Sequence, residues 1–183
     1  MRQGEAFITT RQEKETESIG ALLGKYLQQP LVVALYGELG SGKTVLVRGA
    51  ASGLGVTGPV SSPTFVLLKS YPGRLSLHHF DFYRLEDPEE LYDLGFDEYL
   101  PGDGIAFVEW AGRLPRQLPP ERLDITIERL DDHAGEGRRL WFRPHGAVAS
   151  MVTETLLEGI SWRVDGTLNT IPFLAEEESG RLG

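Results

Sequence analysis

LVVALYGELGSGKT, residues 31–44, is the stretch that decides the fold of this chain. Residues 31–36 form a continuous apolar run, which is typical of a strand buried on both faces of a parallel sheet. Residues 37–44 match the pattern G-x-x-x-x-G-K-[ST], in which a glycine-rich loop joins a strand to a helix. The segment therefore predicts a strand, a phosphate-binding loop and a helix in direct succession.

The residue types within this loop are those that phosphate binding requires. Glycines let the chain curl so that successive backbone N–H groups point at phosphate oxygens. The positive end of the following helix dipole adds to that attraction. Lys43 is placed to contact the β- and γ-phosphates, and the Thr44 hydroxyl is placed to bind Mg²⁺. We therefore expect the loop to bind ATP together with Mg²⁺.

The rest of the chain predicts an α/β domain with a P-loop NTPase-like mixed sheet, a parallel core with antiparallel strands, flanked by helices. We expect strands at residues 6–10, 31–36, 66–71, 75–82, 105–110, 123–130 and 140–142. We expect helices capped by Thr16 or Ser18, at residues 45–54, at 88–94 and at 147–157. Residues 1–145 are assigned to the ATPase domain, and residues 146–183 to a C-terminal extension without an assigned role, ending in a frayed tail at 176–183.

Composition narrows the class of protein. The chain has 183 residues, no cysteine, and 18 basic against 27 acidic residues, for a net charge of −9. The absence of cysteine excludes disulfides, a thiol nucleophile and thiolate metal sites. No signal peptide and no apolar run of about 18 residues is present, so we expect a cytoplasmic protein without membrane contact. The acidic excess disfavours direct binding of nucleic acid, so a polyanionic ligand needs a local device such as the loop at 37–44.

Two carboxylates are candidates for the chemistry beside the loop. A P-loop ATPase needs a carboxylate at the end of a neighbouring strand to hold Mg²⁺. Glu109 ends the apolar run at 105–108 and is the predicted Mg²⁺ carboxylate, with Thr44 as the second ligand. Asp81 ends the alternating strand at 75–80 and is predicted either to orient the attacking water or to act as a switch or outer-sphere metal residue.

Other polar residues are weaker candidates. Residues 61–65, SSPTF, follow the P-loop helix, where a hydroxyl can sense the γ-phosphate. Arg84 and Arg138 are candidate charge stabilisers, with a solvated arginine as the alternative. Adjacent strand residues face opposite sides, so His78 and His79 are expected to pack or to form local hydrogen bonds rather than to share a metal.

Trp110 directly follows Glu109, and its large indole ring can serve in two ways. It is interpreted as a core residue or loop anchor in preference to a ring that stacks on adenine.

These segments together resemble one protein family. Residues 37–44, SPTF at 62–65, HFDFYRL at 79–85 and the EW pair at 109–110 occur in this order. They closely resemble the TsaE family (older name YjeE), an ATPase of tRNA threonylcarbamoyladenosine biosynthesis. The resemblance spans residues 16–140 and leaves residues 146–183 without a counterpart.

The resemblance implies a slow, Mg²⁺-dependent ATP hydrolase. It implies action beside two partner proteins, TsaB and TsaD, in the threonylcarbamoylation of adenosine 37 in tRNAs. A TsaE protein is accessory to that transfer and meets tRNA only through the complex.

By position, the resemblance assigns a metal role to Thr44 and Glu109, a catalytic or switch role to Asp81, a place in the first switch to Thr64, and nucleotide contacts to Thr16 and Arg138. Lys43 is the second predicted catalytic residue, and the glycine-rich loop and the start of its helix are predicted to bind the nucleotide through Leu39, Gly40, Ser41, Gly42, Lys43, Thr44 and Val45.

Two other functions fit a phosphate-binding loop. A small-molecule or nucleoside kinase on the same fold usually adds a lid with several arginines, and no arginine cluster of that kind precedes the C-terminal region. A nucleotide-gated binding module would bind ATP without turnover. A regulatory ATPase is the leading hypothesis because it accounts for both the loop and the two strand-end carboxylates.

Overall fold

The computed structural model of the chain describes residues 6–93, 95–99, 102–130, 137–162 and 168–170. In these ranges the strands are β1 Ala6–Thr10, β2 Leu31–Tyr36, β3 Leu68–Tyr71, β4 Leu77–Asp81, β5 Ile105–Glu109, β6 Arg122–Leu130, β7 Gly137–His145, β8 Ser161–Trp162 and β9 Leu168–Thr170. The α-helices are α1 Glu13–Tyr26, α2 Lys43–Gly53, α3 Glu89–Asp93 and α4 Ala147–Glu158. Short 3₁₀ helices are η1 Phe96–Tyr99, η2 Ala111–Arg113 and η3 Pro115–Gln117.

The central sheet is mixed, as the sequence predicts. Among the described residues its seven strands run in the order β1-β7-β6-β2-β5-β4-β3. Strands β6, β2, β5 and β4 pair in parallel and form the centre. Strands β7 and β1 extend one edge in antiparallel pairing, and β3 does the same at the other edge. The parallel centre is buried on both faces, which is why β2 and β5 read as continuous apolar runs.

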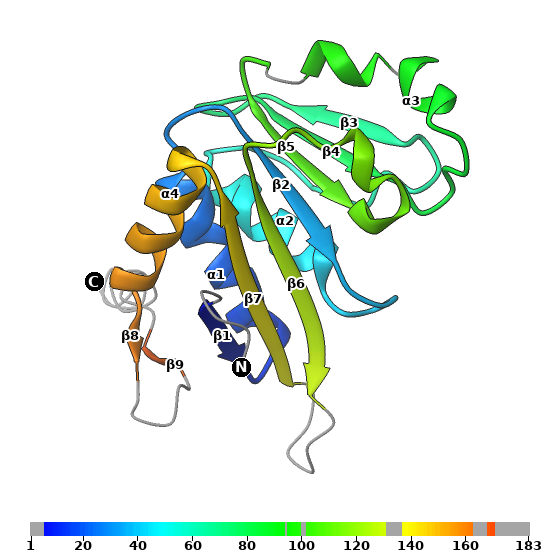
Figure 1. Ribbon diagram of the computed structural model, residues 1–183. Helices are drawn as coiled ribbons and strands as arrows, with labels where there is room; N and C mark the ends of the chain where they lie inside the picture. The colour runs from blue at the N-terminus through cyan, green and yellow to red at the C-terminus, as the bar shows by residue number, and fades with distance from the viewer. Residues whose placement is uncertain (1–5, 94, 100–101, 131–136, 163–167, 171–183) are drawn as a thin grey trace.

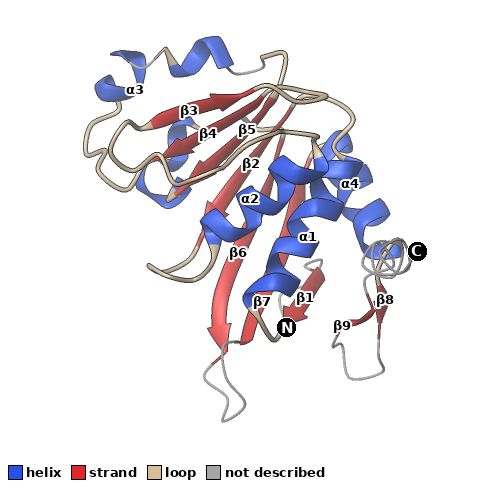
Figure 2. Cartoon of the chain, turned by 180° about the vertical axis from the view of Figure 1, so that it is seen from behind, coloured by secondary structure: helices blue, strands red, loops and turns tan. Residues whose placement is uncertain are grey.

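Helices cover one face of this sheet. Figure 1 shows α1 and α2 behind the long strands β6 and β7 with α4 beside β7, and Figure 2 shows α1 and α2 in front of the sheet when it is seen from behind. Buried side chains such as Leu23, Leu46, Val33 and Ile125 form the core between these helices and the sheet. A second core on the opposite face includes Phe80, covered by residues of α3 and the 3₁₀ helices.

Helices α1 and α2 approach each other through glycines. A Cβ atom on Gly20 or Gly24 of α1 would overlap the backbone of α2, and one on Gly49 or Gly53 of α2 would overlap the backbone of α1. The two helices thus pack backbone against backbone over a stretch of four glycines. This contact matters for the site because α2 begins at the end of the glycine-rich loop.

The structure corrects where the first helix begins. Helix α1 starts at Glu13 with Gln12 as its N-cap, so Thr16 and Ser18 lie inside the helix and do not cap it. The Glu15 carboxylate accepts a hydrogen bond from the Arg11 N–H at 2.7 Å, which fixes the earlier start. Acidic residues in the first turn also favour the helix dipole.

Other boundaries shift by a few residues. Strand β3 begins at Leu68 rather than residue 66, because the N–H groups of Val66 and Leu67 bond back to the Pro63 carbonyl in a turn. Strand β7 is longer than the predicted 140–142, because it pairs with β6 from Leu130↔Gly137 to Arg122↔His145. The predicted tail at 176–183 lies outside the described residues.

The segment after residue 146 contributes to the core. Helix α4 buries Ala149, Val152 and Leu156 in the same cluster as α1 and α2. The division of the chain at residue 146 remains a prediction. None of the helices within the described ranges has the length and apolar character that crossing a membrane requires.

The α1–α2 contact gives a stability prediction. Gly49→Ala should lower the free energy of unfolding by roughly 1–3 kcal/mol, because its new methyl group meets the Glu17 carbonyl of α1. At an open helical position the same exchange would stabilise by about 1 kcal/mol. Ser52→Ala, at an exposed position of α2, is the control and should not destabilise. Thermal unfolding followed by circular dichroism checks this, and equal melting temperatures for Gly49→Ala and the wild type would contradict it.

Candidate functional site

The site lies at the carboxyl ends of three parallel strands of the sheet. The glycine-rich loop follows β2, Asp81 ends β4 and Glu109 ends β5. The register pairs Asp81 with Glu109, and Glu109 with Leu35 two residues before the loop. Ligands of open α/β sheets bind at this carboxyl edge, because the loops there can surround them.

Two glycines set the shape of the loop. Gly37 and Gly42 have φ angles of +140° and +107°, which residues with a Cβ atom rarely adopt. A Cβ atom on Gly37 would also overlap the Ile127 carbonyl of β6. Gly42 is the N-cap of α2, so the loop delivers the chain directly into the helix. The first N–H groups of α2 are thereby left at the mouth of the site.

Lys43 is folded back into the loop. Its Nζ donates hydrogen bonds to the carbonyl oxygens of Gly37 and Glu38, each at 2.9 Å, and lies 4.0 Å from the centre of the Trp110 ring. The side chain is only 4% exposed. Burial lowers the pKa of the Lys43 ammonium group, and the nearby carboxylates of Glu109 and Asp81 offset part of that shift. A cation is thus held at the base of the pocket.

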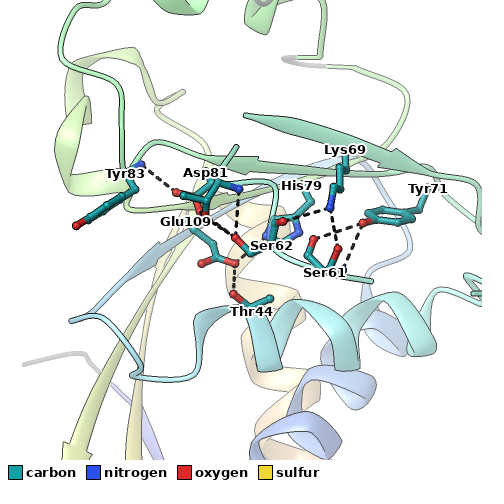
Figure 3. A network of polar contacts seen from close by, with 10 residues as sticks. Thr44, Ser61, Ser62, Lys69, Tyr71, His79, Asp81, Tyr83 and Glu109 are labelled. Atoms are coloured by element: carbon teal, nitrogen blue, oxygen red, sulfur yellow. Dashed lines mark hydrogen bonds and ion pairs between the residues drawn. The ribbon is translucent and has the colours of Figure 1, made fainter. Parts of the chain in front are cut away.

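Thr44 and Glu109 face each other across the site, as Figure 3 shows. The Thr44 hydroxyl donates to Glu109 Oε1 at 2.7 Å, joining the first turn of α2 to the end of β5. His79 Nε2 lies 2.8 Å from the same oxygen. The Thr44 hydroxyl oxygen and Glu109 Oε1 are therefore close enough to bind the same cation, and both are hard oxygen ligands.

Asp81 anchors the loop that carries the SPTF segment. Its Oδ2 accepts hydrogen bonds from the hydroxyls of Thr64 and Ser62, and its Oδ1 accepts one from the Tyr83 N–H. Figure 3 shows Ser62 below Asp81, pointing toward the carboxylate. The carboxylate therefore fixes the loop after α2 to the end of β4.

Lys69 ties the same loop to β3. Its Nζ donates to Ser61 Oγ at 2.7 Å and to the Ser62 carbonyl at 3.2 Å. The loop is consequently held from two sides, by the carboxylate of Asp81 and by the ammonium group of Lys69.

These side chains line a pocket of about 440 Å³. The predicted site residues that line it are Leu39, Gly40, Gly42, Lys43, Thr44, Val45, Thr64, Asp81, Glu109 and Arg138. The structure therefore brings together ten residues from separate segments of the chain that were predicted from the sequence to belong to the site.

Two predicted nucleotide contacts, Thr16 and Ser41, do not line this pocket. Thr16 is fully buried and shares a 2.8 Å hydrogen bond with Thr10 beside the loop. Ser41 is 1% exposed, and its carbonyl accepts a hydrogen bond from Arg138 Nε at 3.1 Å. Both residues are buried, so a nucleotide contact for either stays a prediction.

Three pocket residues were not assigned from the sequence, namely Glu13, Ser62 and Trp110. Ser62 belongs to the SPTF segment, and Trp110 follows Glu109, so both had a local signal. Trp110 has a φ angle of +58°, which turns the chain after β5 and places the ring over Lys43 and beside Tyr83. Glu13 had no signal, because only the packing of α1 on α2 brings it to the loop.

The two histidines face opposite sides of β4, as predicted. His78 Nδ1 is 2.9 Å from Ser70 Oγ, and its ring packs on Tyr99. His79 contacts Glu109 on the helix-covered side. Arg84 lies over the exposed ring of Phe65, 4.6 Å from its centre, and is not among the pocket residues.

The donor set suits one kind of cation. Among the described residues, no group of three or more His, Cys, Asp or Glu side chains is arranged to hold a metal. Thr44 and Glu109 offer two oxygens, and a cation held by so few protein ligands must take the others from water and a phosphate ligand. Mg²⁺ is bound in this way beside substrate phosphates, so the residues fit Mg²⁺ delivered with a nucleotide.

Comparison with known proteins gives one family over most of the chain. The family model described as "Threonylcarbamoyl adenosine biosynthesis protein TsaE" matches residues 10–140. A protein named tRNA threonylcarbamoyladenosine biosynthesis protein TsaE from Bacillus subtilis (strain 168) is 44% identical over 144 residues, which cover 78% of this chain and 88% of that protein. The protein of the same name from Treponema pallidum (strain Nichols) is 40% identical, over 67% of this chain and 91% of its own.

A solved structure has the same fold. The crystal structure of YdiB from Bacillus subtilis superimposes with a TM-score of 0.73 at 37% sequence identity. The match covers 84% of this chain and 95% of that one.

The Asp81 anchor gives a prediction about the SPTF loop. Thr64→Val removes the hydroxyl that bonds to Asp81 and keeps the side-chain shape. A hydrogen bond to a charged group is worth about 1.5–3 kcal/mol, so the amide hydrogens around residue 64 should exchange at least about tenfold faster. Thr57→Val, at an exposed loop position, is the control. Hydrogen–deuterium exchange measures the effect, and identical exchange in both variants would show that the hydroxyl does not hold the loop.

Proposed function

The chain belongs to the TsaE family, and from that premise we propose that it serves threonylcarbamoyladenosine biosynthesis in tRNA as a Mg²⁺-dependent ATP hydrolase. The observation that carries the proposal is the arrangement of Lys43, Thr44 and Glu109 around one pocket at the carboxyl edge of the sheet. The loop offers N–H donors and a lysine for phosphates, and the hydroxyl–carboxylate pair offers oxygens for a cation.

Lys43 has a defined task in this proposal. Its ammonium group now bonds to the Gly37 and Glu38 carbonyls, and it would exchange these partners for phosphate oxygens. The pocket excludes most water from this cation, which strengthens its attraction for an anion. Bound ATP supplies the phosphoric anhydride whose hydrolysis drives the cycle, while Mg²⁺ neutralises phosphate charge.

Asp81 is proposed as the residue that links hydrolysis to the state of the SPTF loop. Its carboxylate lines the pocket and is able to orient a water molecule there. Orienting water at Oδ2 requires Thr64 or Ser62 to give up its hydrogen bond, because both hydroxyls now occupy that oxygen. Orienting water and releasing the loop would then be coupled events.

We also propose that the chain works with TsaB and TsaD and meets tRNA through them. Its net charge of −9 disfavours direct binding of RNA by this chain alone. Next to the pocket, Leu39 is 76% exposed and Phe65 is 85% exposed. Exposed apolar side chains of this size are typical of surfaces that another protein covers.

Lys43→Ala tests the nucleotide site. Loss of a charged donor should weaken ATP binding about 10- to 100-fold and abolish release of phosphate. Lys25→Ala, at the far end of α1, keeps the overall charge equal to that of the first variant and should bind like the wild type. Calorimetry and a phosphate-release assay give the result. Equal affinities for both variants would exclude the loop as the site, and phosphorylation of an added nucleoside by the wild type would favour a kinase.

Partner binding is tested by co-purification with the cognate TsaB and TsaD proteins. We expect the wild type to be retained with ATP and Mg²⁺ and released when EDTA is added, because the SPTF loop lies against the nucleotide pocket. Lys43→Ala should be retained at least about tenfold less well at the same ATP concentration, in line with its weaker ATP binding. Retention that is the same with and without nucleotide, or no retention under any condition, would contradict the proposed partnership.

A further inference from the structure

His79 lies directly beneath the carboxylate proposed to hold Mg²⁺. Its side chain is 0% exposed, and that of Glu109 is 4% exposed. His79 Nε2 is 2.8 Å from Glu109 Oε1, the oxygen that also accepts the Thr44 hydroxyl. Figure 3 shows His79 coming from β4 close to Glu109, partly covered by Ser62 in this view.

The direction of this hydrogen bond follows from the chemistry of the two groups. A carboxylate oxygen only accepts, so Nε2 must carry the proton and donate. Nδ1 is buried and has no hydrogen-bond partner among the described residues. A ring protonated only on Nε2 leaves a bare lone pair at Nδ1, whereas a proton on Nδ1 would leave a buried N–H unpaired. The geometry therefore favours the neutral Nε2–H form.

The sheet register explains why the histidine reaches this carboxylate. His79 and Asp81 are two residues apart on β4, so their side chains lie on the same face. Asp81 pairs with Glu109 on the neighbouring strand, and His79 pairs with Phe107. His79 is thus the diagonal neighbour of Glu109, one step deeper in the sheet.

Glu109 has a competing partner in the same pocket. The Lys43 ammonium group is close enough for the Glu109 carboxylate to raise the lysine pKa against the effect of burial. A carboxylate free to rotate would be drawn to this cation, and both groups would then be lost to ligand binding. A donor fixed beneath Glu109 opposes that rotation.

We propose that His79 is a positioning residue that holds Glu109 Oε1 from the buried side and so keeps the carboxylate aimed at Thr44 and the cation site. The inference rests on the proposed Mg²⁺–nucleotide function and adds a residue that the loop motif does not contain. Donors behind a ligating carboxylate typically account for 10- to 100-fold in metal affinity.

Two amide variants separate positioning from packing. His79→Gln places its Nε2 donor near the position of the imidazole Nε2, whereas the shorter side chain of His79→Asn ends near the position of Nδ1 and cannot reach Glu109. The probe is Mn²⁺, titrated into protein saturated with ADP, with free Mn²⁺ read by electron paramagnetic resonance. ADP affinity in EDTA and the melting temperature are measured on the same samples.

We expect His79→Asn to bind Mn²⁺ about 10- to 100-fold more weakly, with ADP affinity in EDTA unchanged and with His79→Gln close to the wild type. Wild-type Mn²⁺ affinity in a folded His79→Asn would overturn the inference, as would equal losses of metal and metal-free ADP affinity in both variants. Failure of the wild type itself to bind Mn²⁺ with ADP would instead refute the proposed function.

The wild type supplies a second readout if His79→Asn does not fold. Long-range ¹H–¹⁵N spectra distinguish the two neutral tautomers of histidine, and His79 is identified as the signal lost in His79→Gln. We expect the Nε2–H form with and without Mg²⁺ and ADP. The neutral tautomer with its only proton on Nδ1 would overturn the inference, because Nε2 would then have no proton to donate to Glu109.

Discussion

The parallel pairing of β2, β5 and β4 is the constraint on which the site depends. In-register pairing brings the glycine-rich loop, Glu109 and Asp81 to one edge, although 72 residues separate Gly37 from Glu109. Both faces of these strands are packed, so a slip of one strand by one residue would move each of its side chains into the opposite core and would carry its strand-end carboxylate to the other face of the sheet. The geometry of the site is therefore a consequence of core packing.

Two carboxylates in adjacent positions repel each other, and the structure offsets this with donors. The Glu109 carboxylate accepts hydrogen bonds from Thr44 and His79. The Asp81 carboxylate accepts hydrogen bonds from the two hydroxyls of the SPTF segment, and the Lys43 ammonium group lies near both carboxylates. Of the donors to Glu109, His79 is buried in β4, whereas the hydroxyls that bond to Asp81 belong to the SPTF loop. Under the proposed function, binding of a cation at Glu109 and release of the SPTF loop from Asp81 would connect nucleotide state to a partner.

The geometry of the site also depends on residues of α1 and β7 that surround the glycine-rich loop. Glycines at the α1–α2 contact let α1 approach closely enough for Glu13 to line the pocket and for Thr16 to lie behind the P-loop. Arg138, from the distant strand β7, bonds to the Ser41 carbonyl and also lines the pocket. The antiparallel additions to the sheet thus contribute to the same site as its parallel centre.

The sequence by itself determined the mixed α/β fold, the glycine-rich loop between β2 and α2 and the two strand-end carboxylates, because each depends on local pattern: an apolar run, a glycine spacing, an acid at the end of a strand. It placed the start of α1 too late, because Glu15 rather than a hydroxyl residue closes the first turn. Only the tertiary structure decided that Glu13 and Trp110 line the pocket and that His79 supports Glu109. Those contacts join residues from different elements, and their distances are set by helix packing and strand register, which no local pattern encodes.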